Sequence, residues 1–163
     1  MKRLFSVFHA IIMLVTCMAS LTACKTRDGT LDDVSAALMN DHELNSIFSS
    51  ITVDVYNGKS FTARIFFKDT TSDMLREISP EDGCDLAKLV HDKMKEAILE
   101  AGYTKISMIG AMMYSSDWKY DDKHYILDFG VGAANKTHVQ VFAEVSNPIW
   151  DEVVSWGGFG EVG

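Results

Sequence analysis

Four aspartates in the second half of the chain are the first candidates for chemistry. Asp117, Asp121 and Asp122 lie in one charged segment, and Asp128 follows within a stretch of alternating polarity. A pair of carboxylates in one cleft can act as general acid and general base when their surroundings separate their pKa values. A small hydrolase is therefore one prediction, on the condition that two of these side chains converge in a cleft.

Two further pairs have side chains that could act as nucleophile and base. Ser116 and Lys119 have the Ser-x-x-Lys spacing that resembles penicillin-binding enzymes, but that chemistry needs the serine at the start of a helix. Here the pair falls in a charged loop between predicted strands, and nothing resembles the other two motifs of those enzymes. Cys84 and His91 share one face of a predicted helix, but two helical turns separate them by about 10 Å, too far for direct contact. We predict that Cys84 is a packed thiol.

The sequence predicts no metal site and no other cofactor. No His-x-x-x-His or Cys-x-x-Cys spacing is present. The acidic segments 69–73 and 117–122 lack the spacing and the loop glycine of an EF-hand, which favours solvated loops. The histidines that could act as ligands are scattered: His42, His91, His124 and His138.

The N-terminus has the pattern of an export signal. Lys2 and Arg3 precede an apolar run from Phe5 to Val15, which is shorter than the roughly 20 residues that a transmembrane helix needs. The sequence Leu21-Thr-Ala-Cys24 then resembles the lipobox of bacterial lipoproteins at all four positions. The resemblance implies cleavage before Cys24 and lipid on its sulfur. Lys25 is not the aspartate that resembles an inner-membrane retention signal, so in a Gram-negative cell we expect the outer membrane, facing the periplasm.

The expected mature chain is small and acidic. Cleavage before Cys24 would leave 140 of the 163 residues, which suits one domain with a real core. The lost segment holds two basic residues and no acidic one, so the formal charge changes from −8 to −10. A protein this acidic is not expected to bind nucleic acid through counterion release, nor an anionic membrane surface without its lipid. A basic protein or a cationic ligand is its natural electrostatic partner.

Two helices and a short helical turn are predicted from capping residues and apolar spacing. Thr30 to Asp33 resembles a capping box for a helix that ends or kinks at Asn40-Asp41. Ser79 and Pro80 begin the clearest helix, and Gly102 ends it. Its apolar stripe consists of Leu86, Val90, Met94, Ala97, Ile98 and Ala101. Between these helices, the polar segment 68–78 is predicted as a loop with a helical turn around Leu75.

Five strands are predicted, of which the first two form a hairpin. A three-residue loop at 56–58, with Gly58 left-handed, would set Val53 opposite Phe61 and Ile51 opposite Ala63. The other strands are expected within 106–114, 125–131 and 139–145, and the first of them is apolar on both faces, which favours a central position. The order α-β-β-α-β-β-β predicts an α+β, two-layer domain, with a mostly antiparallel five-stranded sheet and helices on one face.

The predicted organisation divides the chain into four parts. Residues 1–23 are the signal peptide, 24–29 a lipidated tether, 30–147 the α+β domain, and 148–163 a short helix with a flexible tail. The segment from Leu38 through Asn40-Asp41 and Leu44 to the strand at 51–58 resembles the start of a BON domain, over about twenty residues. That resemblance implies a periplasmic module associated with phospholipid binding.

Loop aromatics are the most prominent candidates for contact with a partner. All three tryptophans lie outside the predicted strands, and large aromatics are favoured anchors at interfaces. We therefore expect a non-enzymatic envelope lipoprotein that binds a protein partner, as an inhibitor, immunity factor or adaptor. Lipid-ligand binding and hydrolysis are the alternatives. The candidate contact residues are Asp117, Trp118, Tyr120, Asp121, Asp122, Trp150 and Trp156.

Overall fold

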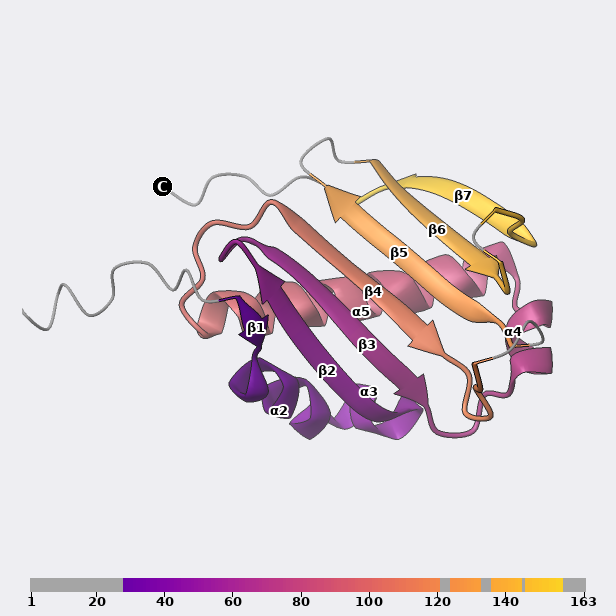
Figure 1. Ribbon diagram of the computed structural model, residues 1–163, viewed down its shortest axis with the longest axis horizontal. Coiled ribbons are helices and arrows are strands. Elements are labelled where there is room, and N and C mark those ends of the chain that lie inside the picture. Colours follow the sequence, from indigo (N-terminus) through magenta and orange to yellow (C-terminus); the bar gives the residue numbers. More distant parts are fainter. Residues whose placement is uncertain (1–27, 121–123, 133–135, 145, 157–163) are drawn as a thin grey trace, which may run out of the picture.

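The computed structural model describes residues 28–120, 124–132, 136–144 and 146–156. Within them, a seven-stranded sheet carries its helices on one face, so the predicted α+β class is confirmed (Figure 1). The predicted number of five strands is wrong. The elements are β1 (Gly29–Thr30), α2 (Asp32–Asn40), α3 (His42–Ile47), β2 (Phe48–Tyr56), β3 (Ser60–Phe67), α4 (Ser72–Glu77), α5 (Pro80–Glu100), β4 (Met108–Tyr114), β5 (Ile126–Gly132), β6 (Lys136–Phe142) and β7 (Trp150–Ser155).

The strands lie in the sheet in the same order as in the chain, from β1 to β7. All neighbours are antiparallel except β3 and β4. Parallel neighbours need a long connection, and here α4 and α5 provide it, with α5 running behind the sheet in Figure 1. The prediction of a mostly antiparallel sheet with β4 at its centre is confirmed.

The long helix α5 forms where its capping residues and apolar stripe predicted it. The Ser79 hydroxyl accepts a hydrogen bond from the amide of Asp82 at 3.1 Å, and Pro80 occupies the first turn. Gly102 follows the helix with a φ of 88°, a left-handed conformation that favours glycine. Val90, Met94 and Ile98 are buried against the sheet, so this helix supplies much of the core.

The first helical segment breaks at Asp41, as predicted, but begins differently. The Asp41 carboxylate accepts hydrogen bonds from the amides of Glu43 and Leu44 and so begins α3. The predicted cap at Thr30 is wrong, because Thr30 lies in β1 and its hydroxyl donates to Asp54 on β2. A strand pairing that the local sequence does not reveal therefore replaces the capping box.

The hairpin has the predicted single apolar face but a different register. Val53 lies opposite Ala63, and Val55 opposite Phe61, whereas Phe61 was expected opposite Val53. The difference is two residues, which leaves every side chain on its predicted face. The turn contains Asn57 and Gly58, with φ values of 53° and 63°, so both take the left-handed conformation.

The largest correction is at the C-terminus, where β7 replaces the predicted short helix of segment 148–163. Residues 150 to 155 pair with β6, and the amide of Ile149 donates to the carbonyl of Val141 at 2.7 Å. Side chains therefore alternate along this segment, and Trp150 and Val154 pack on the core while Val153 is exposed.

The described part contains no helix long and apolar enough to cross a membrane.

Candidate functional site

One face of the sheet carries no helix among the described residues, and we call it the open face (Figure 1). Side chains alternate between the two faces of a strand, so this face takes every second residue of β2 to β7. A solvated sheet face usually carries polar residues. Besides polar residues, the open face carries large side chains such as Tyr56, which is 49% exposed, and Met112, which is 41% exposed.

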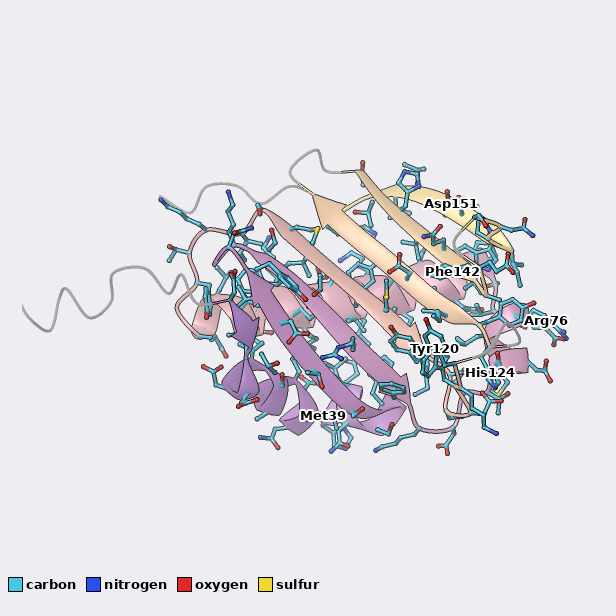
Figure 2. The ribbon with its side chains drawn as sticks, viewed as in Figure 1. Met39, Arg76, Tyr120, His124, Phe142 and Asp151 are labelled. Atoms are coloured by element: carbon cyan, nitrogen blue, oxygen red, sulfur yellow. The ribbon has the colours of Figure 1, made fainter. Side chains whose placement is uncertain are left out.

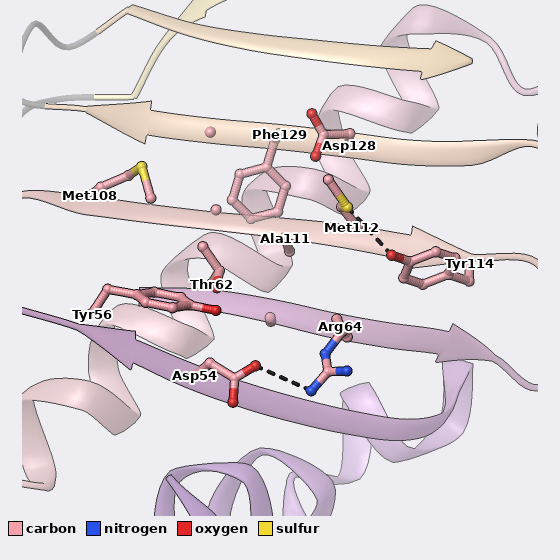
Figure 3. Close-up of a pocket in the computed structure, with 13 residues that line it drawn as sticks. Asp54, Tyr56, Thr62, Arg64, Met108, Ala111, Met112, Tyr114, Asp128 and Phe129 are labelled. Atoms are coloured by element: carbon pink, nitrogen blue, oxygen red, sulfur yellow. Dashed lines mark hydrogen bonds and ion pairs between the residues drawn. The ribbon is translucent and has the colours of Figure 1, made fainter. Parts of the chain in front are cut away.

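A hollow of about 620 Å³ crosses the middle of the open face, and we call it the trough. Its floor is Thr62, Gly110 and Gly130, which are register partners on β3, β4 and β5. Larger side chains line it on both sides (Figure 3). Among them are Asp54, Tyr56, Arg64, Met108, Met112, Tyr114 and Asp128.

The two glycines make the trough for different reasons. A Cβ on Gly110 would lie 3.0 Å from the carbonyl oxygen of Phe129, so the neighbouring backbone approaches too closely for a comfortable side chain. A Cβ on Gly130 would have no atom within 4 Å. The volume above Gly130 is therefore space that an ordinary strand residue would fill.

Charged groups lie on opposite sides of the trough and have different partners. The Arg64 guanidinium lies 3.2 Å from the Asp54 carboxylate, which also accepts a hydrogen bond from the Thr30 hydroxyl at 2.7 Å. The Asp128 carboxylate accepts a hydrogen bond from the side-chain amide of Gln140 at 3.3 Å. Burial raises the pKa of Asp128, and the Gln140 hydrogen bond opposes that effect without cancelling it. Within the described residues, Asp128 has no cationic partner, so its charge is costly.

We expect Asp128→Asn to stabilise the protein at neutral pH. The pKa of Asp128 is raised in the folded state. At pH values just above the ordinary pKa of an aspartate, the native protein therefore binds more protons than the unfolded chain. Stability from this group is therefore lost as the pH rises through the folded pKa, and asparagine avoids the loss. At pH 7, thermal unfolding is expected to give a higher Tm for Asp128→Asn than for the wild type.

The same experiment at acidic pH is the control for this prediction. The difference between Asp128→Asn and wild type is expected to shrink as the pH falls and Asp128 becomes protonated. A variant that is less stable than wild type at pH 7 would show that the carboxylate makes a favourable interaction, against the expectation.

Aromatic side chains gather at one end of the trough, and we call Phe66, Tyr114, Trp118 and Tyr120 the aromatic cluster. The rings of Phe66 and Tyr114 are stacked, with centroids 5.0 Å apart. Trp118 meets Tyr114 edge to face at 4.9 Å and Tyr120 at 6.2 Å. Tyr120 is 96% exposed and lies near the ends of β3 and β4 (Figure 2). Tyr114 belongs to both the cluster and the trough.

The residues expected to contact a partner lie in different parts of the structure. Trp118 and Tyr120 lie together in the aromatic cluster. Asp117, in contrast, accepts a hydrogen bond from the amide of Ser72 at 2.9 Å, so it fixes the start of α4. The pKa of Asp117 is lowered because burial, which raises it, is outweighed by hydrogen bonds that include this amide. Asp121 and Asp122 lie outside the described residues.

Trp150 and Trp156 lie on the helix side of the sheet, away from the aromatic cluster. The indole of Trp150 donates a hydrogen bond to the carbonyl of Ile78 at 3.1 Å, and its ring lies against Gly83 of α5. The ring centroid of Trp156 lies 5.4 Å from that of His91 and 5.6 Å from that of Phe129. Both tryptophans are partly buried and pack on the core, so the structure does not bring these two candidate contact residues together with Trp118.

The candidate nucleophiles have structural surroundings. The Ser116 hydroxyl donates to the carbonyl of Thr70 at 3.1 Å, and Ser116 lies in a loop and not in the first turn of a helix. Cys84 is half-buried, and burial raises the pKa of its thiol, which lowers its reactivity as a nucleophile. Among the residues that the structure describes, no three possible metal ligands come together.

Two carboxylates line the trough from different strands. The backbones of Asp54 and Asp128 are three strand spacings apart, about 14 Å. The open face offers an aromatic end, a floor of small residues flanked by flexible methionines, and two half-buried carboxylates, of which Asp54 is paired with Arg64. No protein-family model matches the chain, and it has no significant match among curated proteins or solved structures.

Proposed function

We propose that the mature protein is a non-enzymatic, lipid-anchored envelope protein that binds a basic protein partner through the open face of its sheet. The aromatic cluster is the observation that carries this proposal. Tyr120 is 96% exposed and lies next to the ring of Trp118, which in turn lies against Tyr114, and apolar surface gathered in one place often marks an interaction site. Exposed aromatic residues beside a hollow are typical anchors of protein interfaces.

The charge of the chain supports a basic partner. The mature form would carry a formal charge of −10, which steers a positively charged protein toward it and repels acidic proteins and nucleic acid. An inhibitor, an immunity factor against a basic toxin or hydrolase, and an adaptor of an envelope assembly all fit these properties.

Lipid on Cys24 is part of the proposal. The segment Leu21 to Cys24 has the lipobox pattern, and several acyl chains hold a protein at a membrane where a single chain is marginal. Residues between Cys24 and β1 would then connect the lipid to the folded domain. In a Gram-negative cell we expect the domain to face the periplasm from the outer membrane.

Lipid-ligand binding is a weaker alternative. It requires an apolar cavity between the helices and the sheet, where Phe61, Ile65, Met94, Ile98 and Phe129 are almost fully buried in the core. The trough lies on the opposite face of the sheet and is open to solvent.

Site-specific photo-cross-linking in the full-length protein tests the proposed function. A photoreactive phenylalanine at position 120 is expected to capture one basic envelope protein in living cells. The matched control places the same group at Lys88, on the outer face of α5, where the side chain is 50% exposed. Trp118→Ala in the position-120 variant is expected to reduce the adduct at least fivefold, because Trp118 packs between Tyr114 and Tyr120.

The possible outcomes separate clearly. One adduct at position 120, absent at position 88, supports the open face as the interface. Equal capture at both positions, or none at position 120, would contradict the proposal and favour a different surface or a ligand that is not a protein.

A further inference from the structure

We propose that the trough receives one arginine side chain of the protein partner, with Asp128 as its counter-ion. This inference rests on the proposed function and gives the contact a defined chemistry. Three features of the trough carry it: its shape, its carboxylate without a cationic partner, and the ring of Tyr114, which lies across Met112 from that carboxylate (Figure 3).

The shape fits a long and narrow group. The floor from Thr62 through Gly110 to Gly130 crosses two strand spacings, about 10 Å. Met108 and Met112 lie along β4 on either side of Gly110, so an aliphatic stem on this floor would contact a flexible thioether on each side.

The charge selects a cation. Asp128 is half-buried and has a neutral amide, that of Gln140, as its hydrogen-bond partner. The nearest cation along the same cross-strand row is Arg64, but Met112 lies between them and Arg64 is paired with Asp54. A half-buried carboxylate without a cation is costly, and an incoming cation would offset that cost. The acidic mature chain adds a general attraction of the same sign.

The aromatic ring favours arginine over lysine. The Tyr114 hydroxyl donates to the sulfur of Met112 at 3.4 Å, so this side chain reaches toward the trough. Tyr114 and Asp128 are diagonal neighbours across β4 and β5, because Met112 lies opposite Asp128 and Tyr114 lies opposite Ile126. Burial raises the pKa of Tyr114, the charge of Arg64 lowers it, and the charge of Asp128 raises it less strongly. A guanidinium can stack on a ring and pair with a carboxylate in two parallel hydrogen bonds, whereas an ammonium group offers a point charge.

Two glycines of β5 provide a matched pair of variants. Gly130 forms the floor of the trough, whereas Gly132 lies on the same strand and face but does not line it. A Cβ at either position would have no atom within 4 Å, and neither backbone takes the left-handed conformation, so valine is tolerated at both. Gly130→Val would fill the trough and Gly132→Val would not. Asp128→Asn removes the charge and keeps the shape.

The probes are two pentapeptides, Gly-Ser-Arg-Ser-Gly and the same peptide with citrulline, which has nearly the shape of arginine but no charge. Each is titrated at millimolar concentrations into the full mature lipoprotein in detergent micelles, and amide NMR shifts are recorded. The arginine peptide is expected to shift the signals of Gly110, Asp128 and Gly130. We expect the citrulline peptide to bind at least tenfold more weakly. Gly130→Val and Asp128→Asn are each expected to weaken arginine-peptide binding about tenfold, about 1.4 kcal/mol, while Gly132→Val leaves it unchanged.

Four results would overturn the inference: equal binding of both peptides, unchanged binding in Gly130→Val, unchanged binding in Asp128→Asn, or no shift at the trough. The amide spectrum of each variant also reports whether it is folded. Failure here is distinguishable from failure of the proposed function. If position 120 still captures its partner and Gly130→Val does not affect capture, the open face is the interface but the trough is not its arginine pocket.

Discussion

Trp150→Ala is expected to lower the free energy of unfolding by about 3 kcal/mol, the lower end of the range for a large aromatic side chain. The ring packs on the backbone of α5 at Gly83, and its indole nitrogen donates to the carbonyl of Ile78. The variant loses both interactions and leaves a void between β7 and the helix. Urea denaturation followed by circular dichroism measures the change, since loss of a tryptophan complicates fluorescence.

A second substitution in both backgrounds shows whether this contact is responsible. In the wild type, a Cβ on Gly83 would lie 2.6 Å from the Trp150 ring, so Gly83→Ala is expected to destabilise by about 1 to 2 kcal/mol. In the Trp150→Ala background the space is free, and the same change is expected to stabilise by about 0.5 to 1 kcal/mol through helix propensity. Equal effects in both backgrounds would show that Gly83 and Trp150 are not coupled.

The structure of this region could not be predicted from its own sequence. Ile149, Trp150, Val153 and Val154 have helical spacing, and Asn147-Pro148 is a favourable helix start. A segment of six residues also fits a strand, and periodicity does not decide between the two. Tertiary contacts determine that this segment is a strand, because the outer edge of β6 is available for pairing and Gly83 of α5 leaves space for the tryptophan ring. The same strand pairing places Trp150 against the core, whereas the sequence placed it in a short helix before the tail.

The hairpin shows what a two-residue pattern can and cannot determine. Alternation fixes which side chains of β2 and β3 are buried, and this was predicted correctly. It cannot distinguish registers that differ by two residues. The turn decides the register, because both Asn57 and Gly58 are left-handed, whereas the prediction gave that conformation to Gly58 alone.

The trough could not be predicted from the sequence, although the glycines that form its floor could be recognised there. Gly110 and Gly130 each interrupt a strand-like segment, and a glycine inside a strand often marks a close approach of backbone. Their adjacency depends on the register between β4 and β5, which no local pattern gives. Trp118 is different, because the sequence predicted its place outside the strands, and the structure shows it half-buried against Phe66 and Tyr114.

The unfolding free energy is expected to fall as the pH is lowered from about 7.5 to about 5.5, and His91 is the main cause. His91 is 1% exposed, and its ring lies near those of Phe129 and Trp156. Burial lowers its pKa, while the neighbouring Asp92 opposes that effect and is outweighed. The unfolded chain therefore binds a proton at a higher pH than the native protein, so stability is lost as the pH falls below the ordinary value of 6.5.

His91→Phe is expected to flatten this pH dependence, as measured by denaturant unfolding across the same range. The control is His138→Gln, since His138 pairs with Asp151 on the open face with its side chain 63% exposed. It should keep the wild-type slope. A slope that persists in His91→Phe would assign it to another group, and Asp128 is not that group. Because its pKa is raised, Asp128 makes stability fall as the pH rises, which is the opposite sign.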